Sequence, residues 1–403
     1  MKKELRKVRL GEIASFVTDK VRSDNLTLAE YVTTDSLLQN KAGRTVAQNL
    51  PPQPCSLTRY KSGDVLIGNI RPYLKKIWLA DGGGGCSNDV LAFRAKEGFS
   101  SSFLYAILSQ DTFFDYLMLA AKGSKMPRGD KDHAMRFKVP FFPIEQQRKI
   151  GKLLSDIDRK IALNRRMNAT LEAMARQLYD YWFLQFDFPD ANGKPYKSSG
   201  GKMTWNNQLK REIPEGWSAS KLSDIANITM GQSPDGSSYN EEGNGSIFYQ
   251  GSTDFGIRFP NIRLFTTAPS RFANKGDILM SVRAPVGALN IANNNCCIGR
   301  GLSALSSKIG SMTHLYYTMD LFRLKFEGMN AAGTTFGSIT KDELHDLPVV
   351  RPAQEVLNSF EQICRPIYDK QMKIGESISA LTRLRTTLLP LLMNGQVEVT
   401  KAL

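Results

Sequence analysis

One sequence pattern occurs twice in this chain of 403 residues, about half the chain length apart. Residues 61–72 are KSGDVLIGNIRP and residues 275–285 are KGDILMSVRAP, so a Gly-Asp turn, an apolar run and a proline recur in order. Upstream, RLGEIASFV resembles KLSDIANIT; downstream, GSKMPRGDKD aligns without a gap to GTTFGSITKD. In that last pair, Lys131 and Lys341 are 341 − 131 = 210 residues apart. So long a period is not that of a solenoid, and it predicts two homologous globular halves.

Within each half, the pattern is typical of a strand-rich domain. DVLIGNIRP and DILMSVRAP are short apolar runs ended by proline, and glycine, asparagine and aspartate turns separate such runs. The proline-containing segments VPFFPIEQQ and LPVVRPAQE follow the last repeated motif of each copy. We therefore expect an α+β fold with two homologous, mixed, strand-rich domains.

Each half then ends in a segment of a different kind. From Ile150 to Trp182, seam positions recur at intervals of four and three, the a/d pattern of a coiled coil, and adding 210 carries this register to Phe360–Leu392. At 1.5 Å per residue, each segment predicts a helix on the order of 50 Å long. We expect the two helices to form an antiparallel coiled coil, the alternative being two amphipathic helices packed on separate cores. The expected seam includes Ile157, Ile161, Asn164, Asn168, Leu171, Ile374, Ile378 and Leu381.

These patterns predict five consecutive segments. Glycine, serine and lysine are frequent between the halves, which indicates a flexible or surface-hugging linker there. Pro366 is expected to kink or restart the second helix near its beginning. The predicted segments are a first domain (1–146), a first long helix (147–186), the linker (187–212), a second domain (213–352) and a second long helix (353–394).

The charge balance predicts a polyanionic partner. Lysine and arginine outnumber aspartate and glutamate 53 to 39, for a net charge of +14. Nucleic acid is the first candidate and a membrane surface the second, while a basic surface without a partner is the alternative. No run of 18 apolar residues is present, so we expect no membrane span. Five cysteines without a CxxC pair favour reduced thiols in a cytoplasm over disulfides or a zinc site.

Motifs of catalysis and cofactor binding are missing from the sequence. It contains no GxxxxGK[ST], GxSxG or HExxH pattern, and DGGGGCSND at 81–89 is expected to be a turn beside a strand. NLPPQP at 49–54 resembles the loop of amino-methyltransferases only superficially, because Leu50 interrupts the Asn-Pro step. His133, His314 and His345 have no metal-ligand spacing and are expected to be structural. We expect no enzymatic activity, metal or cofactor in this chain.

Several of these motifs resemble one known family. The second half opens with REIPEGW and KLSDIANITMGQSP, and it closes with GTTFGSITKDEL and LPVVRPAQE. The first predicted helix ends in YDYWFLQFDFP. Over nearly its whole length, the chain resembles the specificity subunit of type I restriction–modification enzymes. The first half departs from the family pattern, since it lacks IPEGW and has Pro127 and Arg128 where the second copy has Gly-Ser.

The resemblance implies a non-catalytic protein in which each globular half is a target recognition domain. Each domain would bind one part of a split, asymmetric sequence in double-stranded DNA. The paired helices would separate the domains and dock two methyltransferase (modification) subunits, which work with endonuclease/translocase (restriction) subunits. S-adenosylmethionine and ATP are then expected on those partners. A stand-alone DNA-binding regulator is the alternative, and a neighbouring methyltransferase gene would separate the two. A coiled-coil scaffold that binds no DNA would leave the positive charge without a role.

Base recognition requires polar and basic side chains on loops that reach a groove, with phosphate contacts beside them. In the first half these candidates are Lys125, Arg128 and Lys131. In the second half they are Gln232, Ser233, Tyr239, Tyr249, Gln250, Thr334, Thr335, Ser338 and Lys341. The candidates for phosphate contacts are Arg71, Lys75, Lys76 and Arg283. For each of them, a solvated or fold-stabilising role is the alternative.

Overall fold

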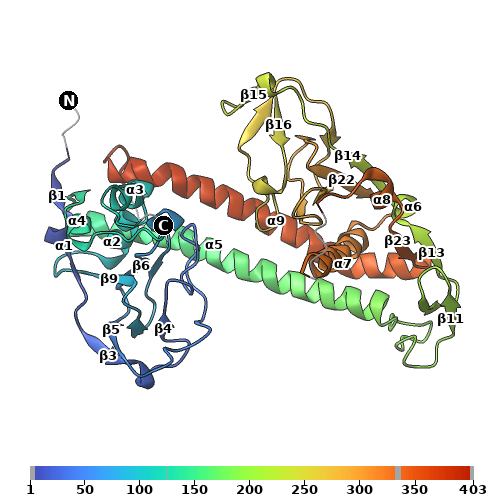
Figure 1. Cartoon of the computed structure of the whole chain (residues 1–403), viewed down its shortest axis with the longest axis horizontal. Coiled ribbons are helices and arrows are strands. Elements are labelled where there is room, and N and C mark those ends of the chain that lie inside the picture. Colours follow the sequence, from blue (N-terminus) through green and yellow to red (C-terminus); the bar gives the residue numbers. More distant parts are fainter. Residues whose placement is uncertain (1–4, 124, 332–336, 400–403) are drawn as a thin grey trace. The chain divides into compact units, whose positions relative to one another are not determined.

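The computed structural model of the chain describes residues 5–123, 125–331 and 337–399 (Figure 1). The chain forms two compact units. The first contains the residues up to Leu163 together with those from Ser379 onward, and the second runs from Asn164 to Ile378. Each unit therefore contains one globular domain and a part of both long helices.

The first unit is built on two four-stranded sheets. One has the order β2 (Ala14–Phe16), β9 (Val90–Ala95), β6 (Val65–Gly68), β7 (Ile77–Leu79). The other has the order β3 (Lys20–Arg22), β5 (Ser56–Tyr60), β8 (Gly84–Cys86), β4 (Tyr31–Val32). A separate pair joins β1 (Lys7–Arg9) to β10 (Lys138–Pro140). The short helices are α1 (Leu10–Ile13), α2 (Ser101–Leu108), α3 (Asp111–Leu119) and α4 (Lys131–Met135).

The second unit repeats the first sheet and the separate strand pair of the first unit, whereas its second sheet has five strands instead of four. Its first sheet has the order β14 (Ala226–Met230), β22 (Leu302–Ser307), β19 (Ile278–Ser281), β20 (Leu289–Ile291). Its second sheet has the order β15 (Tyr239–Asn240), β17 (Leu264–Thr266), β16 (Ser246–Tyr249), β21 (Cys296–Ile298), β18 (Phe272–Ala273). Strand β13 (Ser218–Lys221) pairs with β23 (Pro348–Arg351), as β1 does with β10. The helices are α6 (Leu222–Ile225), α7 (Met312–Ala331) and α8 (Lys341–His345). The predicted duplication and the α+β class are confirmed.

The repeated Gly-Asp motif forms a hydrogen-bonded turn that leads into a central strand. In the first copy, the Lys61 amide donates to Asp64 Oδ2 at 2.8 Å, and in the second the Asn274 amide donates to Asp277 Oδ2 at 2.7 Å. The glycine before each aspartate has a φ of +88° or +95°, a conformation that side chains other than glycine rarely adopt. The two phrases are alike because both turns need an acceptor and a glycine at these two places.

The two long helices are α5 (Ile144–Tyr179), continued by a π-helical turn at Asp180–Leu184, and α9 (Gln354–Met393). Within the second unit they pair antiparallel, because Asn164 Nδ2 donates to Ser377 Oγ at 3.1 Å while Gln371 Nε2 donates to Glu172 Oε2 at 2.7 Å. In the first unit Arg385 of α9 pairs with Asp158 of α5 at 2.5 Å. Mutual pairing, rather than packing on separate cores, is what the structure shows.

The predicted seam positions are buried to different degrees. Ile157, Ile161, Asn164, Asn168 and Ile374 are buried, whereas Leu171, Ile378 and Leu381 are half-buried. A polar seam residue such as Asn164 specifies register when it has a hydrogen-bond partner, which Ser377 provides.

Helix α9 differs from expectation at Pro366, through which it continues without interruption. Proline removes the hydrogen bond to the carbonyl four residues earlier, that of Gln362. Both Pro366 and Gln362 lie on an exposed face of the helix, where water can satisfy that carbonyl.

The segment predicted as a linker has structure of its own. It contains a hairpin of β11 (Met203–Asn206) and β12 (Arg211–Pro214). Phe188 stacks on Tyr196 and on Trp217, with ring centroids 4.7 Å and 5.1 Å apart. These aromatic contacts attach the segment to the core of the second unit, so it hugs the surface and is not a free tether.

Candidate nucleic-acid interface

In the first unit, two candidate loops that lie far apart in the sequence meet at one edge. Ile70, which follows strand β6, forms an antiparallel bridge with Arg128 of the loop before α4, which we call the closing loop of this domain. The Arg71 amide also donates to the Pro127 carbonyl at 2.7 Å. The side chains of Arg71, Lys125, Arg128 and Lys131 are all exposed here. The fold thereby gathers basic groups, separated by some sixty residues of chain, on one surface.

The second unit makes the same junction with different side chains. Arg283, which follows β19, bridges Ser338 of the second closing loop, and the Ala284 amide donates to the Gly337 carbonyl at 3.2 Å. Arg283, Ser338 and Lys341 are exposed. Thr334 and Thr335 lie outside the described residues. The same backbone frame thus presents Arg128 in one copy and Ser338 in the other.

A further set of candidates lies next to this junction in the second unit. The Gln232 amide donates to the Ile298 carbonyl at 3.0 Å, and the Arg300 amide donates to Ser233 Oγ at 3.2 Å. The Val282 amide, in turn, donates to the Gly301 carbonyl at 2.9 Å. Gln232 and Gln250 have exposed side chains. Backbone hydrogen bonds therefore hold the GQSP turn, the segment after β21 and the Arg283 loop next to one another.

Two residues that we predicted to contact DNA are less exposed to solvent than expected. Tyr249 is fully buried and its hydroxyl donates to Asn293 Oδ1 at 3.3 Å, so its prediction as a DNA contact is wrong. Strand β16 lies between β17 and β21 and places this side chain in the core. Tyr239 is half-buried, and its hydroxyl donates to the Pro234 carbonyl at 3.0 Å.

The lysines proposed for phosphate contacts already have partners. Lys75 and Lys41 share Asp111, at 2.9 Å and 2.6 Å. Lys76 donates to the Thr34 carbonyl. Arg128, in contrast, meets Asp89 at 3.1 Å while its side chain stays 59% exposed. Among the first-half candidates, Arg128 has a side chain that is both held in position by an ion pair and largely exposed.

Sequence reasoning missed three groups at these edges. Arg300 is exposed beside Ser233, and Tyr73 and Met126 are exposed on the two loops that meet in the first unit. Each of these residues follows a Gly, Pro or Lys in a short loop. Such a residue indicates a turn, but it does not indicate which adjacent side chain is exposed. The DGGGGCSND segment does form β8 and a turn, and its Asp89 positions Arg128.

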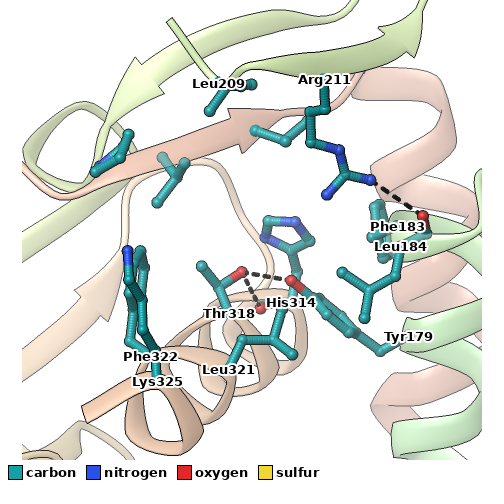
Figure 2. Close-up of a pocket in the computed structure, with 13 residues that line it drawn as sticks. Tyr179, Phe183, Leu184, Leu209, Arg211, His314, Thr318, Leu321, Phe322 and Lys325 are labelled. Atoms are coloured by element: carbon teal, nitrogen blue, oxygen red, sulfur yellow. Dashed lines mark hydrogen bonds between the residues drawn. The ribbon is translucent and has the colours of Figure 1, made fainter. Parts of the chain in front are cut away.

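Two of the three histidines, His133 and His314, occupy structural positions. His133 stacks on Tyr116 with ring centroids 4.0 Å apart, and His314 lies in the core of the second unit at 2% exposure. Figure 2 shows His314 beside Tyr179, Thr318 and Arg211, around a largely apolar cavity of about 210 Å³. The Tyr179 and Thr318 hydroxyls lie 3.1 Å apart. Within the described residues, no group of three or more histidine, cysteine, aspartate or glutamate side chains could hold a metal ion. No helix among those residues is long and apolar enough to cross a membrane.

The burial of His314 predicts acid-dependent stability. Desolvation lowers the pKa of His314 to about 3, whereas an unfolded histidine titrates near 6.5. Below pH 6.5 the unfolded state therefore binds a proton that the folded state does not, and the free energy of unfolding falls as the pH falls. Between pH 7.5 and pH 5, His314→Phe should lose about 2 kcal/mol less than the wild type in chemical denaturation. Equal losses would contradict a neutral buried imidazole.

The comparisons with known proteins agree with the two-domain architecture. The family described as type I restriction modification DNA specificity domain matches residues 3–173 and 214–390. The putative type I restriction enzyme MjaX specificity subunit of Methanocaldococcus jannaschii is 30% identical over 74% of this chain and 67% of its own length. The MjaIX specificity subunit of the same organism is 25% identical over 86% of this chain and 80% of its length.

The fold is also found in a solved structure. The S subunit of a type I restriction–modification system from M. genitalium is similar at a TM-score of 0.60 and 15% identity, over 97% of this chain and 96% of that one. The family match covers both halves of the chain, and each half has its own junction, Ile70 with Arg128 in the first and Arg283 with Ser338 in the second. The chain belongs to the family of type I restriction–modification specificity subunits and carries two copies of their DNA specificity domain.

Proposed function

We propose that each unit of this chain binds one part of a bipartite, asymmetric DNA sequence. The observation that carries the proposal is the junction repeated in both units, where a loop after the central strand bridges the closing loop and displays exposed polar and basic side chains. Because the backbone frame is shared while the side chains differ, the two recognised half-sequences need not be related. The net charge of +14 supplies the attraction to phosphates that such binding requires.

In this proposal the chain performs no chemistry and acts with partners. Two methyltransferase subunits would dock on helices α5 and α9, and restriction subunits would join that complex in the cytoplasm. Exposed apolar side chains on these helices, among them Met167, Met174 and Ile363, support a docking role. S-adenosylmethionine and ATP would be bound by the partners. A stand-alone regulator would not need two matched domains of the specificity family.

Arg128 is the residue for which we expect a base contact. Its guanidinium is held by Asp89 yet largely exposed, and arginine pairs best with the O6 and N7 atoms of guanine. Arg128→Ala should cost about 1–3 kcal/mol of DNA binding and relax one base of the first half-sequence. Methylation sequencing of a host that carries the variant with its methyltransferase partner would reveal that relaxed position.

Lys75→Ala is the matched comparison. Lys75 lies at the same edge, but Asp111 retains Lys41 as a partner when Lys75 is removed. This variant should weaken binding to all sequences alike, with a smaller dependence of affinity on salt. A uniform loss for Arg128→Ala as well would assign Arg128 to the phosphate contacts.

A further inference from the structure

We propose that a pocket in the second unit, lined by four arginines, is a binding site for a phosphate-type oxyanion. The pocket has a volume of about 510 Å³. Helices α5, α7 and α9, strand β20 and the loop before β17 form its walls, and all of its residues belong to the second unit. The inference is independent of the proposed DNA contacts, because it concerns side chains away from the two junction loops. Its charged lining consists of Arg165, Glu172, Arg176, Arg258, Asp320 and Arg323.

Arg258 is the group that points to a ligand. It is 7% exposed, and its Nη1 donates to Glu172 Oε2 at 2.8 Å. The guanidinium carbon lies 5.2 Å and 5.4 Å from the ring centroids of Tyr316 and Tyr368, which fix its plane. Its Nε and Nη2 are buried without a hydrogen-bond partner in the described part of the chain. Leaving donors of a charged group unpaired in the interior is costly, so an acceptor is expected there.

The charge of the lining selects an anion. Glu172 already accepts from both Arg258 and Gln371, and Asp320 pairs with both Arg176 and Arg323. Among the described residues, Arg165 has no ion pair, and its Nε is also buried without a hydrogen-bond partner. Arg323 also pairs with Glu327, outside the lining, at 2.8 Å. The four guanidinium groups thus meet three carboxylates, an excess of one positive charge. Water could fill the volume, but it would not neutralise this excess.

The donor set fits a phosphate group. Guanidinium groups present paired N–H donors that match the oxygens of phosphate in a bidentate arrangement. The volume is many times the roughly 30 Å³ of one water molecule, so the pocket accommodates a phosphate with atoms attached to it. Two sources supply the same chemistry: a free phosphorylated compound and a phosphate of the DNA backbone.

The test is calorimetric titration of the full chain with inorganic phosphate at constant ionic strength. Arg165→Gln removes one unpaired guanidinium from a half-buried helix position, and Arg166→Gln, at the exposed neighbouring position, is its control. The wild type should bind phosphate with saturation at one site. Arg165→Gln should weaken the Kd about tenfold or more, the loss expected for one charge-assisted hydrogen bond, whereas Arg166→Gln should match the wild type.

A thermal unfolding curve of each variant without phosphate checks that it is folded. Absence of saturable binding by the wild type would overturn the proposal, as would equal Kd values for the two variants. A second arm repeats the phosphate titration with a non-specific DNA duplex present. Competition by the duplex assigns the site to a backbone phosphate, and unchanged phosphate binding assigns it to a free phosphorylated compound; either result supports an oxyanion site.

Discussion

Replacing residues 214–350 with the corresponding segment of another family member is expected to change the second recognised half-sequence and leave the first unchanged. The structure supports this exchange because strands at the two ends of the segment pair with each other. Strand β13, near its beginning, pairs with β23, near its end, so that Ser218 faces Arg351 and Lys221 faces Pro348. The core residues Leu222, Ile278 and Leu305 pack with one another inside the segment. A transplanted domain therefore brings its own core and its own junction loops.

Side chains of the segment also contact the helices, and its aromatic residues there help determine whether the chimera folds. Trp217 and Tyr317 belong to the cluster that contains Tyr179 of α5 and Phe360 of α9. A donor that retains an aromatic residue at both positions should preserve this packing. Methylation sequencing of a host carrying the chimera reads both half-sequences at once. A change in the first half-sequence would contradict independent recognition by the two domains.

Arg94→Met is expected to destabilise the first unit by about 3 kcal/mol, the typical cost of stranding one member of a buried ion pair. The Arg94 Nε and Nη2 atoms donate to the two oxygens of Asp64, both at 2.8 Å. The Asp64 side chain is 1% exposed. Without Arg94, this carboxylate would still accept a hydrogen bond from the Lys61 amide, but it would have no positively charged partner. Urea denaturation of the full chain should show a lower midpoint for the transition of the first unit.

The double variant Arg94→Met with Asp64→Asn provides the control. Asparagine can still accept from the Lys61 amide and carries no charge, so it should recover much of the lost stability. The second copy offers a natural comparison, since Asp277 makes the same turn while half-buried and has Ser306 in the place of Arg94. If Arg94→Met alone cost less than about 1 kcal/mol, Asp64 would not depend on its ion pair.

Local patterns in the sequence were sufficient to predict the duplication, the two long helices and their seam. A Gly-Asp turn, an apolar strand and a four-and-three spacing each depend on residues that are neighbours in the chain, so they can be recognised without tertiary information. The same holds for the capped turns that open each domain. There the Arg9 amide donates to Glu12 at 2.7 Å, and the Lys221 amide donates to Asp224 at 2.9 Å. Family membership followed from such motifs together with their order.

Contacts between distant residues were decided only by the tertiary structure. The pairing of Ile70 with Arg128, the sharing of Asp111 by two lysines and the stacking of Phe188 on Trp217 all join segments that no spacing relates. Tyr249 shows most directly what local sequence cannot predict. A tyrosine at the end of a strand can face solvent or core, and the strands on both sides of β16 determine that it faces the core. Local sequence specifies which elements form, but burial and electrostatic partners depend on how those elements pack.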